Sequence, residues 1–181
     1  CSLIDDRLEA NLDYAYDENW GYLTTCPTNV GTGLRASVML HLPSVSMTGE
    51  IKTIIEGLRK IGLTARGLYG EGSEALGYLY QISKQTTLGE AEEEIIDKLN
   101  RVILQNITHE RSTRERLREK RKLELEDRIY RSYGILSHSR ILSSKEAMEH
   151  LSNVRLGWVM GLIENNKLKD ILRLMIEIQP A

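Results

Sequence analysis

The spacing of apolar residues predicts strands and helices in the first hundred residues. Helices are expected where apolar residues recur every three or four positions, in residues 3–16, 48–61 and 88–108. Strands are expected where short or alternating apolar runs lie between glycines and prolines, at residues 21–25, 34–42, 64–69 and 78–83. Pro43 is expected to end the second strand, because proline cannot donate a ladder hydrogen bond.

The pattern changes near residue 109. Seven basic residues, interleaved with glutamates, lie between Arg111 and Lys122, which is typical of a solvated helix held by ion pairs. Further helices are expected at residues 145–163, capped by Ser143 or Ser144, and at 167–178. The sequence therefore predicts an α+β chain, with strands and helices in residues 1–110 and an all-helical part in residues 111–181.

Composition excludes several classes of protein. The chain has 181 residues, 41% of them hydrophobic, and a formal net charge of −2, so nothing biases it toward nucleic acid or membranes. No apolar run approaches the roughly 18 residues of a membrane span, and no basic helix face indicates DNA binding. Two cysteines, Cys1 and Cys26, make no disulfide framework, so we expect a reducing cytoplasm. A helical pattern is already under way at Leu3, so we expect a piece of a longer protein.

Two glycine-rich stretches match the pattern G-x-G-x-x-A, at residues 31–36 and 70–75. In a dinucleotide-binding fold this pattern follows a strand and opens a helix. Here each stretch leads into a strand-like run, and neither carries the lysine of a P-loop. Dinucleotide binding is therefore not expected, although glycine still lets backbone N–H groups approach a phosphate closely.

The segment from Cys26 to Arg35 is the most informative part of the chain. It places a cysteine at the end of a predicted strand, then a glycine-rich turn, then an arginine. A thiolate, several N–H donors and a fixed cation in one small volume suit an anionic phosphate beside a cationic substrate. The alternative is a purely structural turn that contains an inert, buried cysteine.

The stretch CPTNVGTGLRASV, from Cys26 to Val38, resembles the signature of the ATP:guanido phosphotransferases, the phosphagen kinase superfamily. Its continuation to Pro43, and the later stretches LELEDRIYRSYGIL and LSNVRLG, are most similar to the bacterial protein-arginine kinase branch. The resemblance implies that residues 1–110 are the C-terminal part of a guanido-kinase catalytic domain, with an antiparallel sheet flanked by helices. It implies that residues 111–181 are a helical extension for regulation, dimerisation or substrate recruitment.

The resemblance also implies a reaction, the transfer of the γ-phosphoryl group of ATP, with Mg²⁺, to an arginine side chain of a protein. A guanidinium is protonated below a pH of about 12, so it must be aligned and relieved of a proton. By the family's pattern, nucleotide-binding residues are expected at six positions: Asn29, Gly31, Thr32, Gly33, Arg35 and Arg66. No metal-ligating protein residue is predicted.

Two further residues are expected to act on the acceptor. Cys26 matches the family's reactive cysteine, and a thiolate there would orient the guanidinium by its charge without forming a covalent bond. Glu71, in the stretch RGLYGE, matches the glutamate of arginine-directed members, and a carboxylate can accept two parallel N–H bonds from a guanidinium. We therefore predict Glu71 as clamp and proton acceptor.

The sequence departs from the family in three places. The position of an adenine-side histidine holds Met39, which with Val38 is expected to pack against adenine, and an acidic position holds Gln81. The family's acidic N-E-E-D loop has no counterpart in residues 1–25. Little or no kinase activity is therefore expected from these residues alone.

Partners follow from the resemblance only. It implies protein substrates, an activator protein, a heat-shock repressor, the Clp protease machinery and a homodimer, in a cytoplasmic stress response. Two other functions stay open, a free-arginine kinase and a non-catalytic interaction module.

Overall fold

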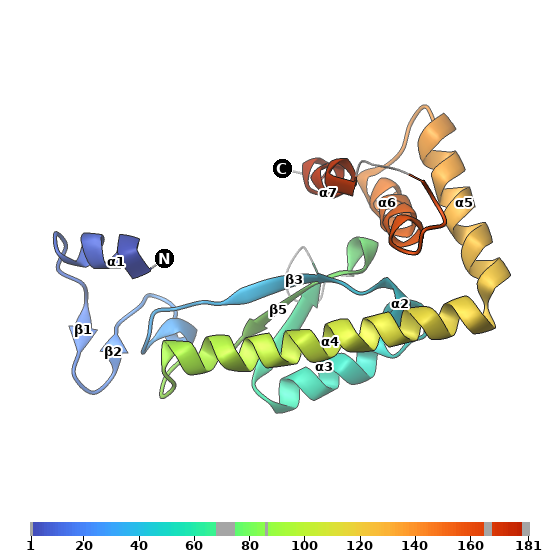
Figure 1. The fold of residues 1–181 in the computed structure, drawn as a ribbon. Helices are drawn as coiled ribbons and strands as arrows, with labels where there is room; N and C mark the ends of the chain where they lie inside the picture. Colours follow the sequence, from blue (N-terminus) through green and yellow to red (C-terminus); the bar gives the residue numbers. More distant parts are fainter. Residues whose placement is uncertain (1, 68–74, 86, 165–167, 179–181) are drawn as a thin grey trace.

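The computed structural model describes residues 2–67, 75–85, 87–164 and 168–178 (Figure 1). Its centre is a three-stranded antiparallel sheet of β3 (Ser37–His41), β4 (Leu63–Gly67) and β5 (Leu79–Lys84), in the order β3-β5-β4. The predicted α+β class with an antiparallel sheet flanked by helices is thereby confirmed.

Helices α3 (Ile51–Lys60) and α4 (Glu92–Lys120) cover one face of this sheet (Figure 1). The core between them is formed by apolar side chains from all three parts: Leu40, Tyr80 and Ile82 from the sheet, Leu58 from α3, and Leu99 and Ile103 from α4. Because side chains alternate along a strand, the residues between these core positions face the opposite side of the sheet.

The first 25 residues form a small separate unit. Helix α1 (Ser2–Glu9) is shorter than the predicted helix over 3–16, and a hairpin of β1 (Tyr16–Asp17) and β2 (Gly21–Tyr22) follows it. The Asp17 carboxylate accepts hydrogen bonds from the backbone N–H groups of Asn19 and Trp20 at 2.8 and 3.1 Å. This aspartate turn closes the hairpin, which explains why the apolar spacing alone gave the wrong length for the helix.

Pro43 ends the strand as predicted, and it also opens a short helix, α2 (Pro43–Met47). The buried Glu110 carboxylate caps α2 by accepting the N–H groups of Ser44 and Val45 at 3.0 and 3.1 Å. Since Glu110 belongs to α4, this pair of charge-assisted bonds joins the two helices.

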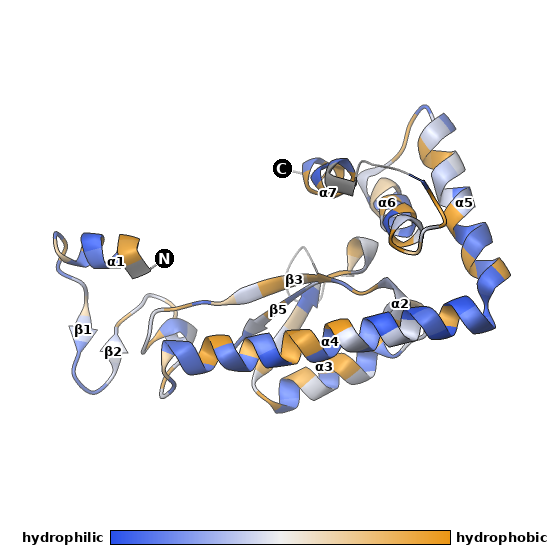
Figure 2. Ribbon diagram, viewed as in Figure 1, coloured by the Kyte–Doolittle hydropathy of each residue, from blue (hydrophilic) through white to orange (hydrophobic). Residues whose placement is uncertain are grey.

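Helix α4 runs without interruption through residue 109, where the sequence pattern predicted a change of element. The predicted end of a helix at residue 108 is wrong, because no glycine or proline occurs there and the buried stripe continues through Glu110, Thr113 and Leu117. Only the outer surface changes, from mixed to strongly hydrophilic (Figure 2). The chain bends at Arg121, whose φ and ψ of −136° and 37° are not helical. The division into residues 1–110 and 111–181 stays a prediction.

The helical part consists of α5 (Lys122–His138), α6 (Ser144–Val159) and α7 (Leu168–Glu177). Ser143 caps α6 as predicted, since its hydroxyl accepts the Glu146 N–H at 3.2 Å. Helices α5 and α6 pack so closely that a Cβ built on Gly157 would lie 2.3 Å from Ile129 Cγ2. Within the described ranges, no helix combines the length and apolar character needed to cross a membrane.

Candidate active site

The cysteine of the signature segment lies at the start of a short 3-10 helix, η1 (Pro27–Asn29). Its side chain is exposed, and its Sγ lies 2.9 Å from Thr28 Oγ1. This hydrogen bond, a second one to the Thr28 backbone and the positive charge of Arg35 together lower the pKa of the Cys26 thiol, although partial burial opposes them. The thiol is therefore accessible, which excludes the alternative of a buried cysteine, while its action on the acceptor stays a prediction.

The glycine turn that follows is held by its own backbone. Gly31 exchanges two backbone hydrogen bonds with Tyr22, at 2.8 and 3.2 Å, and Gly33 N–H donates to the Asn29 carbonyl at 3.1 Å. Gly31 has a φ of 108°, and a Cβ there would lie 3.0 Å from Leu88 Cα, so only glycine fits without strain. The N–H groups of Gly31 and Gly33 are thus already used inside the turn in this conformation.

Thr87 contacts this turn from a distant part of the chain, and the sequence pattern did not indicate it. Its side chain is buried, and its hydroxyl donates to the Val30 carbonyl at 2.9 Å and lies 3.4 Å from the Thr28 carbonyl. Thr87 therefore fixes the turn from a segment 57 residues away. Nothing in the local spacing could have revealed it, because the contact exists only through the fold.

Arg35 lies between the turn and the first strand of the sheet. The next residue, Ala36, packs against the sheet core, whereas Arg35 is exposed. Among the residues that the structure describes, Arg35 forms no ion pair, and its charge acts on Cys26. Arg35 is thus close enough to Cys26 for its charge to help lower the pKa of the thiol, and the role of both residues stays a prediction.

Arg66 occupies the sheet face opposite the core. In the ladder Met39 is paired with Gln81 and Gln81 with Arg66, so these residues form one row across all three strands. Gln81 Nε2 donates to Ser37 Oγ at 2.9 Å, and 46% of Met39 is exposed. Met39 is exposed, whereas Gln81 and Arg66 are half-buried, and Arg66 gives this row its positive charge.

Val38 does not share this face. Its side chain packs with the core beneath the sheet, while Met39 points to the open side. The expectation that Val38 and Met39 together pack against adenine is therefore wrong, because neighbouring residues in a strand point in opposite directions. Glu71 lies in residues 68–74, outside the described residues.

A cavity of about 790 Å³ lies beside the turn, between α1, the hairpin and the start of α4. Thr32 and Gly33 line it, but its charged lining residues are all acidic: Asp5, Asp13 and Glu92. Negative charge repels phosphate, so this cavity does not suit a nucleotide triphosphate. The sheet face that carries Arg66 has the appropriate charge.

Comparison with known proteins identifies the family of the chain. The family model described as "ATP:guanido phosphotransferase, C-terminal catalytic domain" matches residues 1–113. The chain belongs to the ATP:guanido phosphotransferase family. A second model, described as "Protein-arginine kinase McsB C-terminal domain", matches residues 122–181, which contain α5, α6 and α7.

Curated relatives of this family member are named protein-arginine kinase. The relative from Halalkalibacterium halodurans is 57% identical over 178 residues, which cover 98% of this chain and 50% of that protein. The relative from Bacillus subtilis is 52% identical over 178 residues, which cover 98% of this chain and 49% of that protein. The chain thus spans about half the length of the curated relatives it matches.

Two solved structures of other guanido kinases are similar to the catalytic part. A taurocyamine kinase from Schistosoma mansoni with bound transition state analog components superposes with a TM-score of 0.53 at 32% identity, covering 61% of this chain and 16% of that one. A lombricine kinase superposes with a TM-score of 0.50 at 31% identity, covering 60% of this chain and 29% of that one. The likeness supports a shared fold over about 60% of the chain.

Proposed function

We propose that the longer protein to which these residues belong is an ATP-dependent protein-arginine kinase. The observation that carries the proposal is the exposed Cys26 of the signature turn, whose thiol pKa the charge of Arg35 helps to lower, with Arg66 on the sheet face opposite the core. A soft anion and two permanent cations are the groups needed where a guanidinium meets a triphosphate. The relatives' name and the second family match, over residues 122–181, favour a protein as the acceptor.

Arg35 and Arg66 bind the phosphates of ATP in this proposal. Arg66 is in register with Met39 through Gln81, so Arg35 is displaced from it by four positions along the chain as well as by two strand spacings. Planar guanidinium groups form charge-assisted bonds with phosphate oxygens and keep their charge, which suits both arginines to a triphosphate. Asn29 and the turn of Gly31, Thr32 and Gly33 form the near wall of the site.

The acceptor arginine approaches from the side of Cys26. The thiolate attracts the guanidinium by charge, and no covalent bond forms at sulfur. The attacking guanidinium nitrogen forms a bond to the γ-phosphorus in line with the breaking bond to the bridging oxygen of ADP. The nitrogen must lose one proton, and Glu71 is the proposed acceptor of that proton.

Mg²⁺ is proposed to enter with the nucleotide. In the described part of the chain no three carboxylate, histidine or cysteine side chains gather as a metal site. Mg²⁺ commonly keeps several waters and binds through substrate phosphates, which fits an ATP–Mg²⁺ complex held by arginines. The ion would neutralise charge on the transferring phosphoryl group.

The wider setting is also a proposal. We propose a cytoplasmic homodimer in a stress response, which phosphorylates arginines of protein substrates and works with an activator protein, a heat-shock repressor and the Clp protease machinery. The support for this setting is the similarity to protein-arginine kinases. A free-arginine kinase remains the second candidate, because the turn and Arg66 would serve either acceptor.

The experiment uses a protein of the relatives' full length that contains this chain. It is incubated with ATP, Mg²⁺ and either an arginine-rich protein or free arginine, and the products are kept at neutral pH because phosphoarginine is acid-labile. We expect phosphoarginine on the protein, and a rate at least about 100-fold lower for Arg35→Gln but unchanged for the exposed Arg59→Gln on α3. If only free arginine is phosphorylated, the free-arginine kinase is favoured. If only phosphoserine forms, both kinase candidates are rejected. If the protein binds no nucleotide, a non-catalytic interaction module is favoured.

A further inference from the structure

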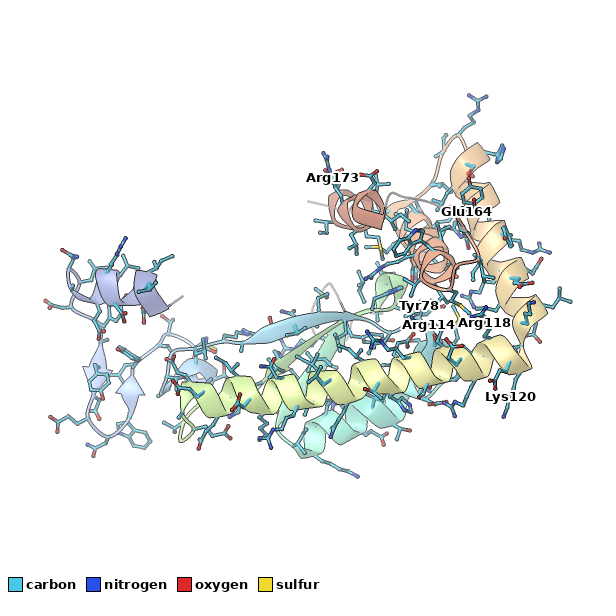
Figure 3. The ribbon with its side chains drawn as sticks, viewed as in Figure 1. Tyr78, Arg114, Arg118, Lys120, Glu164 and Arg173 are labelled. Atoms are coloured by element: carbon cyan, nitrogen blue, oxygen red, sulfur yellow. The ribbon has the colours of Figure 1, made fainter. Side chains whose placement is uncertain are left out.

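Two arginines lie at the junction between the sheet and the helical part. Arg114 belongs to α4, and Figure 3 labels it on the side of that helix that faces the helical part. Arg155 belongs to α6, one turn after Ser152, whose buried hydroxyl lies 2.7 Å from Nε2 of His41 at the end of β3. Burial, followed by the positive charge of Arg114, lowers the pKa of the Arg155 guanidinium. The two like charges are therefore neighbours in a poorly solvated place.

The negative charge at this junction does not balance both arginines. Among the described residues Arg114 pairs only with Glu110, at 3.4 Å. That carboxylate also accepts the backbone N–H groups of Ser44 and Val45. Arg155 forms no ion pair within the described ranges, and no carboxylate contributes to the shift of its pKa. A charge withdrawn from water is costly unless an opposite charge pairs with it, so this junction favours a further anion.

Polar atoms without a hydrogen-bond partner mark the same place. In the part of the chain that the structure describes, the Nε atoms of Arg114 and Arg155 are buried and unpaired, and so is the hydroxyl of the fully buried Ser44. Ser44 lies beside Arg114, because its N–H and the Arg114 guanidinium share one oxygen of Glu110. Buried polar groups nearly always have a partner. Three donors around two cations suit an acceptor that carries negative charge and several oxygens.

We infer that this junction binds a small oxoanion of the phosphate type, with Arg114 and Arg155 as its main ligands and the Ser44 hydroxyl as a third donor. Planar guanidinium groups form charge-assisted bonds to phosphate oxygens, and a tetrahedral anion can accept from two such groups at once. Only 17% of the Arg114 side chain is exposed, so a free ion such as inorganic phosphate fits better than a phosphorylated protein segment. The bound anion offsets the repulsion between the arginines and fixes α6 to α4.

This site is separate from the proposed ATP site. Arg35 precedes β3 and His41 ends it, so the signature turn and the junction lie at opposite ends of the strand. Binding of phosphate at the two places can therefore be distinguished by variants. Arg35→Gln should weaken binding at the signature turn and leave the junction intact, whereas Arg155→Gln should do the reverse.

The test follows the melting temperature of a protein of the relatives' full length that contains this chain, in inorganic phosphate and in chloride of equal ionic strength. Phosphate should raise the melting temperature of the wild type by about 3 °C or more above its value in chloride. Arg155→Gln should lose most of this gain, and Arg155→Lys should lose part of it. The control Arg118→Gln should keep the full gain, because Arg118 is exposed and lies one turn along α4 from Arg114.

Two further readouts separate an anion site from a packing role of Arg155. In chloride, Arg155→Gln removes one of two like charges, so this variant should melt at or above the temperature of the wild type. Calorimetric titration with inorganic phosphate should give a Kd about tenfold higher for Arg155→Gln than for the wild type. Arg35→Gln should keep the wild-type Kd for the junction.

Several results would overturn the inference. Equal melting temperatures of the wild type in phosphate and chloride would show that ionic screening is the whole effect. A full phosphate gain in Arg155→Gln, or its loss in Arg35→Gln, would place the bound phosphate elsewhere. If Arg155→Gln does not fold, Arg155→Lys decides, since an unchanged Kd for phosphate would overturn the inference. None of these results depends on whether the protein phosphorylates arginine.

Discussion

His41 Nε2 and Ser152 Oγ lie 2.7 Å apart, although 111 positions separate the two residues in the sequence. His41 ends β3 and Ser152 belongs to α6, so this hydrogen bond joins the catalytic sheet to the helical part. Burial, followed by the positive charges of Arg155 and Arg114, lowers the pKa of His41 to about 3. The imidazole is therefore neutral in the folded protein at physiological pH.

This neutral histidine predicts a loss of stability in mild acid. Below its ordinary pKa of about 6.5 the unfolded chain binds a proton that folded His41 does not bind until about pH 3. Its contribution to stability is thus complete above pH 6.5 and is lost as the pH falls toward 3. At pH 5 the loss is about 2 kcal/mol.

Urea unfolding at pH 7.5 and pH 5 measures this contribution. The free energy of unfolding should fall by about 2 kcal/mol more in the wild type than in His41→Gln. His138→Gln, a change at an exposed histidine at the end of α5, should keep the full wild-type fall. If the free energy of unfolding falls equally in the wild type and in His41→Gln, folded His41 is already protonated at pH 5, which contradicts the prediction.

The Cys26–Thr28 hydrogen bond predicts a shift in thiol reactivity. In a Cys1→Ser background, alkylation of Cys26 should have its pH midpoint below that of an ordinary cysteine, because Thr28 stabilises the thiolate. Thr28→Val should raise the midpoint and slow alkylation at pH 7, whereas Thr25→Val should leave both unchanged. If the pH midpoint of alkylation is the same in the wild type and in Thr28→Val, the proposed thiolate charge on the acceptor side is contradicted.

The close packing of α5 on α6 predicts opposite effects at two helical glycines. Gly157→Ala forces a methyl group against Ile129 Cγ2 and should lower the free energy of unfolding by about 1–3 kcal/mol. Gly134→Ala meets no atom within 4 Å and should be neutral or stabilising by up to about 1 kcal/mol. Calorimetric melting of both variants tests the packing, and equal effects would contradict it.

The signature turn predicts a similar contrast at Gly31 and Gly89. Both have a positive φ, so alanine strains the backbone at either position. Only at Gly31 does the new methyl also meet backbone, 3.0 Å from Leu88 Cα. Gly31→Ala should therefore be the less stable variant by about 1 kcal/mol or more, measured by urea unfolding, and the opposite order would contradict the contact with Leu88.

The sequence predicted those features that depend on neighbours in the chain. The strand that ends at Pro43 and the Ser143 cap each follow from a few adjacent residues. The length of α4 was misjudged because a change in surface charge resembles a boundary, although the buried stripe continues to Leu117.

Features set by distant residues could not be predicted. Thr87 supports the turn from 57 positions away. The row of Met39, Gln81 and Arg66 depends on the pairing of three strands that are distant in the sequence. The placement of the site on the open face therefore needed the fold.

The most direct test of the proposed site is a crystal structure of the full-length protein with Mg²⁺ and a non-hydrolysable ATP analogue. We predict that Arg35 and Arg66 both place guanidinium nitrogens within about 3.2 Å of phosphate oxygens, with Cys26 Sγ facing the same cleft. A nucleotide bound in the acidic cavity beside α1, or one that contacts neither arginine, would contradict the account.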